Sequence, residues 1–427
     1  MDYISDSCHT FGNQFCSRDK YFEDHPEYFA LRKGKRTSKQ LCLTNPDVLR
    51  IVTDEVLELL KKKHDPSQNL QIVSLTQDDN SEYCTCEKCA ALDKANGSQS
   101  GTMITFVNEV ARAVKEAGYD NVAIDTFAYT YSRKAPTNVV PDDNVIVRLC
   151  SIECCFGHTL DDPKCKENVK FMEDLQAWKK ICSNIHIWNY SGNYSYSVCV
   201  FPDFHVLQRD MQIFYENNCR GIYVEGIYYM DRCDGEFGEL RSYLISKLMQ
   251  DPYMDYDAAM NDFLEHFYGA GWQNIREFID IVCLHSADKY TTTNISIDPE
   301  DTLPGITSKE IKRCDELWQA AKENATPEQL DRIERSEISW RFWKECNYKS
   351  EFSLLRSPLK RMNAKLTLYN NIKDKDIKKI GGQVQRDLTE NMAMVLLRRA
   401  TRWCLRYEDI IWETLEPLGT WLYNIIK

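Results

Sequence analysis

Apolar residues along the chain alternate between short continuous runs and the spacing of amphipathic helices. The continuous runs predict five β-strands, at residues 71–76, 122–129, 144–152, 185–190 and 221–226. Helical spacing predicts amphipathic helices at residues 46–60, 103–114, 171–178, 204–214 and 237–248. Asn45 and Pro46 mark the start of the first helix, because Asn caps a helix and Pro suits its first position. Strands that alternate with helices predict a parallel sheet made of βα units.

The two faces of the predicted sheet differ in polarity. One face carries apolar residues: Val122, Ile124, Val147, Leu149, Ile185, Ile187, Ile222 and Val224. The other face mixes polar and aromatic residues: Asp125, Tyr129, Arg148, His186, Trp188, Tyr223 and Glu225. A barrel turns an apolar set toward its helices and a mixed set toward its lumen, whereas a doubly wound sheet is apolar on both faces. The asymmetry therefore favours an α/β fold of the (β/α)8 TIM-barrel type.

Only five strands can be recognised, whereas such a barrel has eight. Residues 8–15 and 21–31 have the pattern of a loop leaving a strand that would precede Met1, so we expect the barrel domain, residues 1–272, to lack its first strands. Residues 273–427 show no strand pattern. They show amphipathic spacing instead, at residues 311–321, 327–342 and 388–411, and predict an α-helical C-terminal domain.

Composition is that of a soluble globular protein, with 43% hydrophobic and 28% charged residues in a chain of 427. The formal net charge of −12 disfavours a nucleic-acid partner, because phosphates are repelled. No apolar run approaches the roughly 20 residues of a membrane span. The 18 cysteines are too few for a disulfide scaffold, so reduced thiols are expected. Residues 1–14 show no signal-peptide pattern.

Acidic residues stand at the ends of three predicted strands. Active sites of parallel sheets gather at these carboxyl ends, which makes Asp78 or Asp79, Glu153 and Glu225 the catalytic candidates. Simple alternation favours Asp78 over Asp79 and turns Glu153 away from the lumen. Asp78, Asp79 and Asn80 also suit an ordinary turn.

Aromatic rings beside carboxylates suit a carbohydrate, whose C–H faces are apolar and whose hydroxyls seek polar partners. The candidate substrate-binding residues are Asp78, Asn80, Asp125, Tyr129, Arg148, Trp188, Asn189 and Tyr223. A carbohydrate is therefore the expected partner.

Three cysteines, Cys84, Cys86 and Cys89, lie within six residues directly after the Asp-Asp-Asn segment. This spacing indicates a structural zinc site that shapes the loop, with no cofactor needed for catalysis. Structural zinc takes four ligands, and the fourth would come from Cys42, Cys154, Cys155 or Cys165. Three thiols without metal, or one local disulfide, would account for the spacing equally well.

Several segments resemble the domain of unknown function 4838, classed as glycoside hydrolase family 163. The stretches that carry the resemblance are HPEYFA at 25–30, QLCLTNP at 40–46, DN at 79–80, YCTCEKC at 83–89, RLCSIECCF at 148–156 and GEFGELR at 235–241. The resemblance runs from about His9 to Gly271, and these motifs occur in the family's order. It implies a (β/α)8 barrel that acts as an endo-β-N-acetylglucosaminidase, exported by gut bacteria to degrade N-glycans, with an oligosaccharide or glycoprotein glycan as its partner.

The resemblance also favours Asp79 over Asp78. In a retaining, substrate-assisted reaction, one carboxyl group orients the substrate acetamide and another donates a proton to the leaving oxygen. Asp79, with Asn80, is expected to hold the acetamide, and either Glu153 or Glu225 to be the acid. The alternatives are a non-catalytic or degenerate carbohydrate-binding module of the same fold, and a metal-dependent or thiol enzyme that uses the cysteine cluster.

Overall fold

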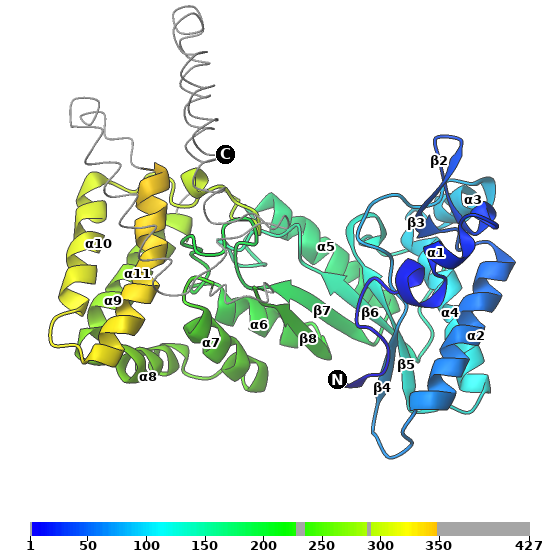
Figure 1. Ribbon diagram of the computed structural model, residues 1–427, viewed down its shortest axis with the longest axis horizontal. Coiled ribbons are helices and arrows are strands. Elements are labelled where there is room, and N and C mark those ends of the chain that lie inside the picture. Colours follow the sequence, from blue (N-terminus) through cyan, green and yellow to red (C-terminus); the bar gives the residue numbers. More distant parts are fainter. Residues whose placement is uncertain (1, 228–234, 288–291, 348–427) are drawn as a thin grey trace, which may run out of the picture.

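The computed structural model describes residues 2–227, 235–287 and 292–347 (Figure 1). The helix predicted at residues 388–411 lies outside these ranges. The described residues contain one parallel six-stranded sheet and one antiparallel hairpin, surrounded by helices. The predicted α/β class is therefore confirmed.

The six strands are ordered β1 (Asp2–Tyr3), β4 (Gln71–Ser74), β5 (Val122–Ala128), β6 (Val145–Cys150), β7 (Ile185–Tyr190) and β8 (Gly221–Glu225). All five predicted strands are present, and β1 adds a sixth at residues 2–3, whereas the sequence pattern had placed the strand before the loop at residues 8–15 ahead of Met1. The sheet curls like half of a barrel (Figure 1). Among the described residues, β1 and β8 are its two edges.

The helices predicted from periodicity are also present, with bounds that differ from the predicted ones by up to five residues. They are α2 (Pro46–Lys63), α4 (Ser100–Glu116), α5 (Lys166–Ile181), α6 (Leu207–Glu216) and α7 (Gly238–Gln250). The side chain of Asn45 accepts hydrogen bonds from the backbone N–H groups of Asp47 and Val48, at 2.8 and 3.5 Å, and so caps α2 as expected.

Two elements between β1 and α4 carry weak periodicity and were not predicted. The hairpin consists of β2 (Phe29–Arg32) and β3 (Lys35–Leu41), and α3 (Glu87–Asn96) follows the cysteine cluster. A short helix, α1 (Arg18–Tyr21), precedes the hairpin. These elements lie together at one end of the molecule (Figure 1).

The outer face of the sheet is packed against helices. Val73, Ile124 and Val145 of the sheet share one buried core with residues of α2 and α4, and Leu149 and Ile187 pack in a second core with residues of α5 and α6. The predicted apolar face therefore points toward the helices. Burying each such side chain contributes about 1.5–3 kcal/mol, which makes this packing the main source of stability.

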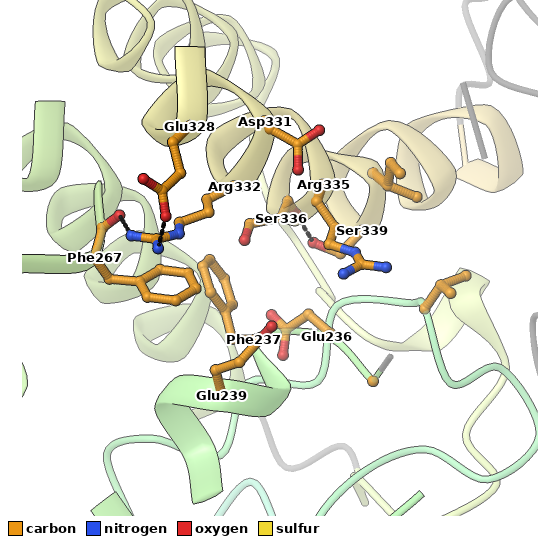
Figure 2. A pocket seen from close by; sticks show the side chains of 13 residues that line it. Glu236, Phe237, Glu239, Phe267, Glu328, Asp331, Arg332, Arg335, Ser336 and Ser339 are labelled. Carbon is orange, nitrogen blue, oxygen red and sulfur yellow. Dashed lines mark hydrogen bonds and ion pairs between the residues drawn. The ribbon is translucent and has the colours of Figure 1, made fainter. Parts of the chain in front are cut away.

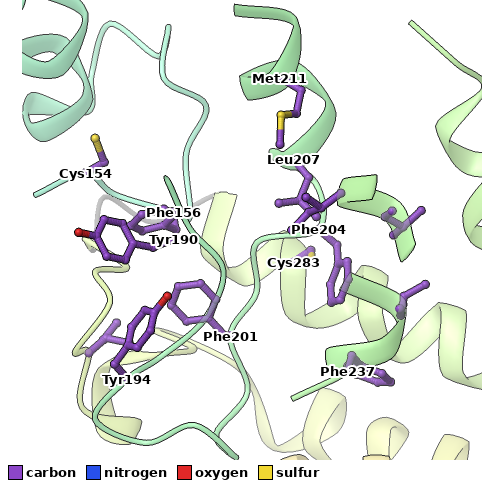
Figure 3. Packing of buried hydrophobic residues seen from close by; sticks show 14 of the residues in the cluster. Cys154, Phe156, Tyr190, Tyr194, Phe201, Phe204, Leu207, Met211, Phe237 and Cys283 are labelled. Carbon is purple, nitrogen blue, oxygen red and sulfur yellow. The ribbon is translucent and has the colours of Figure 1, made fainter. Parts of the chain in front are cut away.

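The second core continues into the C-terminal helices, which are α8 (Tyr256–Tyr268), α9 (Trp272–Ala287), α10 (Ser308–Ala321) and α11 (Pro327–Asn347). Figure 3 shows part of it, where Phe201, Phe204 and Phe237 gather between the sheet loops and α7. The ring of Phe237 stacks on Trp318 of α10 at 6.2 Å between centroids. The predicted domain boundary at residue 272 stays a prediction, and buried contacts cross it.

No helix within the described ranges has both the length and the apolar character that spanning a membrane requires.

Candidate functional site

A cavity of about 490 Å³ lies at the carboxyl ends of the sheet strands, on the inner face. Its lining combines strand residues with residues of the loops that follow: Cys8, His9, Asp79, Phe127, Tyr129, Cys150, Ile152, Trp188, Tyr190, Tyr194, Ser195, Glu225, Ile295 and Ser296. The volume suits a ligand of sugar size or larger. The strand residues belong to the face predicted to be mixed in character.

Glu225, the last residue of β8, places its carboxyl group in this cavity. The indole N–H of Trp188 donates a hydrogen bond of 2.9 Å to its Oε2. Its backbone carbonyl accepts hydrogen bonds from the hydroxyls of Ser191, at 2.9 Å, and Tyr194, at 2.6 Å. Burial raises the pKa of Glu225, and the negative charge of Asp79 adds to this rise, whereas the Trp188 hydrogen bond opposes it. A carboxyl group with a raised pKa keeps its proton to a higher pH than an ordinary carboxyl group, so it can act as a proton donor.

Asp79 lines the same cavity from the loop after β4. The hydroxyl of Tyr129 donates a hydrogen bond of 2.9 Å to its Oδ1. Strand pairing of β4 ends at Ser74, so alternation no longer governs the side chains that follow. Asp79 and Glu225 therefore share one cavity although 146 residues separate them in sequence.

Aromatic side chains form much of the cavity wall. The rings of Phe127 and Trp188 meet edge to face with centroids 5.4 Å apart, and those of Tyr190 and Tyr194 do so at 5.8 Å. Figure 3 shows Tyr190 and Tyr194 next to each other, where the cavity lining joins the buried core. Such rings offer flat apolar surfaces beside the two carboxyl groups.

Sequence reasoning missed His9, which is part of the lining. Its Nδ1 lies 2.7 Å from the backbone carbonyl of Gln77, and its ring lies 5.6 Å from that of Phe127. His9 has a positive φ of 53°, a backbone conformation uncommon outside glycine. Its place in the loop after β1 was the available signal, but β1 is too short to be recognised in the sequence.

Asp78 lies outside the cavity lining and faces α1. Its carboxylate pairs with Arg18 at 3.2 Å, and burial raises its pKa to about 6. Gly12 packs so closely that a Cβ at that position would come within 2.5 Å of Oδ2 of Asp78. The structure thus separates the two adjacent carboxyl groups: Asp79 enters the cavity, and Asp78 fastens the loop to the N-terminal segment.

Asn80 and Glu153 also lie outside the lining. Oδ1 of Asn80 accepts hydrogen bonds from the side chain of Gln40, at 3.1 Å, and from the backbone N–H of Glu82, at 3.0 Å, so it shapes the turn. Glu153 follows β6 with a half-exposed side chain and forms an ion pair with Arg133. Of the three catalytic candidates, the cavity contains Asp79 and Glu225.

Asp125 and Arg148 form a buried ion pair of 2.7 Å on the inner face of the sheet. The hydroxyl of Tyr3 donates a hydrogen bond of 2.9 Å to Asp125, and the Arg148 guanidinium lies over the rings of Phe127 and Trp188. Neither charged residue lines the cavity. The pair supports two rings of the aromatic wall from within the sheet.

Of the four remaining substrate-binding candidates, two line the cavity and two lie outside its lining. Trp188 and Tyr129 line the cavity. Oδ1 of Asn189 instead accepts a hydrogen bond of 2.6 Å from the hydroxyl of Ser151. Tyr223 is 43% exposed, and its ring packs at 4.4 Å against Trp188 without lining the cavity.

Four cysteines form a cluster near the Asp79 loop: Cys42, Cys84, Cys86 and Cys89, with all sulfur atoms within 4.8 Å of one another. Cys42 follows the hairpin and is the fourth member; Cys155 and Cys165 belong to a different group. The sulfur of Cys42 lies 3.7 Å from that of Cys86 and 3.9 Å from that of Cys89. These distances match a tetrahedral site with metal–sulfur bonds of about 2.3 Å, so the cluster could hold a metal.

A second cavity, of about 350 Å³, lies between α11 and the start of α7 (Figure 2). Arg332 on α11 pairs there with Glu328, and its guanidinium also donates to the carbonyl of Phe267 at 3.1 Å. Glu236 pairs with the buried Arg241 at 2.8 Å. Arginine neutralises these two acidic groups, and helices rather than strand ends provide the lining. The first cavity is therefore the candidate site.

No curated protein matches the chain. A family model described as "Domain of unknown function (DUF4838)" matches residues 2–280, a range that contains the whole sheet, the four-cysteine cluster and both cavity carboxyl groups. The match covers well over half of the chain and agrees with the resemblance found in the sequence motifs. The chain therefore belongs to the DUF4838 family.

Proposed function

We propose that this protein is a retaining glycoside hydrolase that cleaves N-acetylglucosamine-containing glycans, with the activity of an endo-β-N-acetylglucosaminidase. The observation that carries the proposal is the pairing of Asp79 and Glu225 in one cavity with aromatic walls. Glycosidases use two carboxyl groups in different protonation states, and burial together with the nearby Asp79 charge favours the protonated form of Glu225.

Glu225 is the proton donor in this proposal, and Asp79 positions the substrate acetamide. The acetamide oxygen attacks the anomeric carbon while Glu225 gives its proton to the leaving glycosidic oxygen, which breaks the glycosidic bond. The Asp79 carboxylate accepts the acetamide N–H and balances the positive charge of the cyclic intermediate. Ionised Glu225 then takes a proton from water, the water oxygen attacks the anomeric carbon, and the ring of the intermediate opens with net retention.

Two neighbouring side chains support these roles. The Tyr129 hydroxyl orients Asp79 through its hydrogen bond to Oδ1, which leaves the other oxygen for the acetamide. The indole N–H of Trp188 stabilises Glu225 once it has lost its proton. The rings of Trp188, Tyr190 and Tyr194 are placed to pack on sugar C–H faces.

Three further parts of the proposal concern the protein around the site. The curled six-stranded sheet is part of an eight-stranded (β/α)8 barrel. The four-cysteine cluster holds a structural zinc, because four thiolates at these separations suit that ion. The glycan substrate implies an exported protein.

The test is hydrolysis of an N-glycan with an intact chitobiose core, followed by mass spectrometry of the released sugar. We expect Glu225→Gln and Asp79→Asn each to lower turnover about 10²- to 10⁴-fold. Glu153→Gln is the matched control and should retain wild-type turnover, because Glu153 lies outside the cavity. Wild-type turnover in both cavity variants would overturn the proposal. Glycan binding by the wild type without hydrolysis would favour the carbohydrate-binding alternative.

A further inference from the structure

A second group of metal-ligand side chains lies in the loop between β6 and α5. Cys155, His158 and Cys165 are all buried, and their donor atoms lie within 4.8 Å of one another. The Sγ of Cys155 is 3.2 Å from Nδ1 of His158. Cys165 is the N-cap residue directly before α5. The group shares no residue with the four-cysteine cluster.

One buried amide holds the loop in this shape. Oδ1 of Asn168 accepts a hydrogen bond of 2.9 Å from the backbone N–H of Cys155. Its Nδ2 donates to the carbonyls of Cys155, His158 and Thr159, at 3.0, 2.9 and 3.1 Å. Two of the three ligand residues are therefore fixed by the same side chain. Metal sites depend on such a surrounding shell, because it orients the ligands before the ion binds.

We propose that Cys155, His158 and Cys165, together with Glu167, form a second structural site for a zinc-type divalent cation. Thiolate and imidazole ligands favour zinc among the common divalent ions. Zinc holds sulfur and nitrogen at about 2.3 and 2.1 Å, so neighbouring ligand atoms in a tetrahedral site lie about 3.3–3.8 Å apart.

Glu167 would complete the site as its fourth ligand by turning its carboxyl group toward the other three, since it touches only Cys165 of them in the structure. It lies in the first turn of α5, and its Oε2 is 3.8 Å from the Sγ of Cys165. The Cys155–His158 separation is near the tetrahedral range, and the donor atoms of Cys155, His158 and Cys165 lie within 4.8 Å of one another, so these three residues can hold the ion while Glu167 turns toward it.

The second site connects to the wall of the candidate active site. The backbone N–H of Thr293 donates to the Sγ of Cys155 at 3.2 Å, and its carbonyl accepts from the backbone N–H of Phe156 at 2.8 Å. Two residues further, the carbonyl of Ile295 accepts a hydrogen bond of 2.7 Å from the backbone N–H of Tyr194. Ile295 and Tyr194 both line the 490 Å³ cavity. A bound ion would therefore hold one wall of that cavity in place from behind.

Gly157 permits the close contact between the β6–α5 loop and Thr293. A Cβ at Gly157 would come within 2.2 Å of the Ser286 hydroxyl oxygen and 2.7 Å of that of Thr293. With a side chain at position 157, the loop could not lie this close to Ser286 and Thr293 unless their side chains moved.

The experiment is zinc analysis of the purified full chain by mass spectrometry. We expect the double variant Cys155→Ser/Cys165→Ser to contain one zinc equivalent less than the wild type, whatever the four-cysteine cluster contains. Cys154→Ala is the matched control, because Cys154 is the adjacent buried cysteine, belongs to the apolar core (Figure 3) and should leave the zinc content unchanged. A double variant with wild-type zinc content would overturn the proposal.

Milder variants keep the proposal testable if the double variant does not fold. His158→Asn and Glu167→Gln should each release one zinc equivalent to a competing chelator at least tenfold faster than the wild type. If His158→Asn releases zinc at the wild-type rate, the proposed site is wrong. If Glu167→Gln does so, Glu167 is not the fourth ligand. Neither measurement depends on hydrolase activity. The results therefore test the second metal site separately from the proposed function.

Discussion

The indole N–H of Trp188 donates a 2.9 Å hydrogen bond to Oε2 of Glu225, and this contact joins the aromatic wall of the cavity to the carboxyl group proposed as proton donor. A hydrogen bond to a carboxylate stabilises the ionised form, so the contact lowers the pKa of Glu225 while burial raises it. The balance between them sets the pH at which the group can act as an acid.

Trp188→Phe should therefore shift the pH profile of hydrolysis. Loss of the N–H donor raises the pKa of Glu225 further, by about one unit, since a hydrogen bond to a charged group contributes about 1.5 kcal/mol. Activity that requires protonated Glu225 falls as pH rises through this pKa, so the alkaline limb should move to higher pH. Tyr223→Phe is the control, because that ring packs on Trp188 outside the cavity. A limb that stays in place or moves to lower pH would contradict the role of Trp188.

Asp125→Asn should strongly destabilise the protein. It leaves the buried Arg148 guanidinium without its charged partner, which costs about 3–5 kcal/mol of unfolding free energy. Asp142→Asn is a matched control, because Asp142 also pairs with an arginine, Arg112, at 2.7 Å but near the surface. The control should lose at most about 1 kcal/mol. Urea unfolding measures both values, and equal losses would contradict the importance of burial.

Asp78 should make stability depend on pH. Its pKa is raised from 3.8 to about 6, so the folded protein binds this proton more tightly than the unfolded chain does. Its contribution to stability is therefore complete below pH 4 and decreases until about pH 6, by about 3 kcal/mol.

The measurement for Asp78 compares unfolding free energies of the wild type and Asp78→Asn from pH 4 to pH 7. The variant has no carboxyl group to titrate, so the wild type should lose stability relative to it over this range. A difference between the two proteins that does not change with pH would show that Asp78 ionises normally.

Cys42→Ser should remove one zinc equivalent and lower the midpoint of thermal unfolding. The four-cysteine cluster joins the β2–β3 hairpin to the loop after Asp79, since the backbone N–H of Leu31 also donates to the Sγ of Cys84 at 3.3 Å. Chelator treatment of the wild type should produce the same thermal shift. Cys16→Ala, a buried cysteine outside both groups, should retain the zinc. Unchanged zinc content in Cys42→Ser would refute this site.

The strands and the main helices could be predicted because they follow local rules. Each has a run or a periodic stripe of apolar residues, and each stripe is buried where expected, as for Val52 in α2 and Ile187 in β7. The polar inner face also followed from alternation, which placed Trp188 and Glu225 on one side. The hairpin and α3 lack such a stripe, so they were not predicted. Ala30 and Leu31 of the hairpin are packed against the four-cysteine cluster, which includes Cys89 of α3.

The site itself was only partly predictable. Alternation favours Asp78, yet Asp79 enters the cavity, because strand pairing stops at Ser74 and Arg18 holds Asp78 elsewhere. The sequence could not choose between Glu153 and Glu225. In the structure Glu153 pairs outside the cavity with Arg133, which lies 20 positions earlier in the chain, and no local pattern predicts this contact. Ile295 and Ser296 reach the cavity through contacts with residues more than 100 positions away, which no local pattern encodes.

The ring contact between Phe237 and Trp318 has a consequence for ligand binding. It belongs to one uninterrupted core that runs from beneath the cavity to the last described helix. A sugar that binds in the cavity binds only the native state, so it raises the free energy of unfolding. All elements that unfold in one cooperative step with the cavity are stabilised by the same amount. Saturating glycan should therefore slow amide hydrogen exchange in α10 and α11, elements that contribute no residue to the cavity lining.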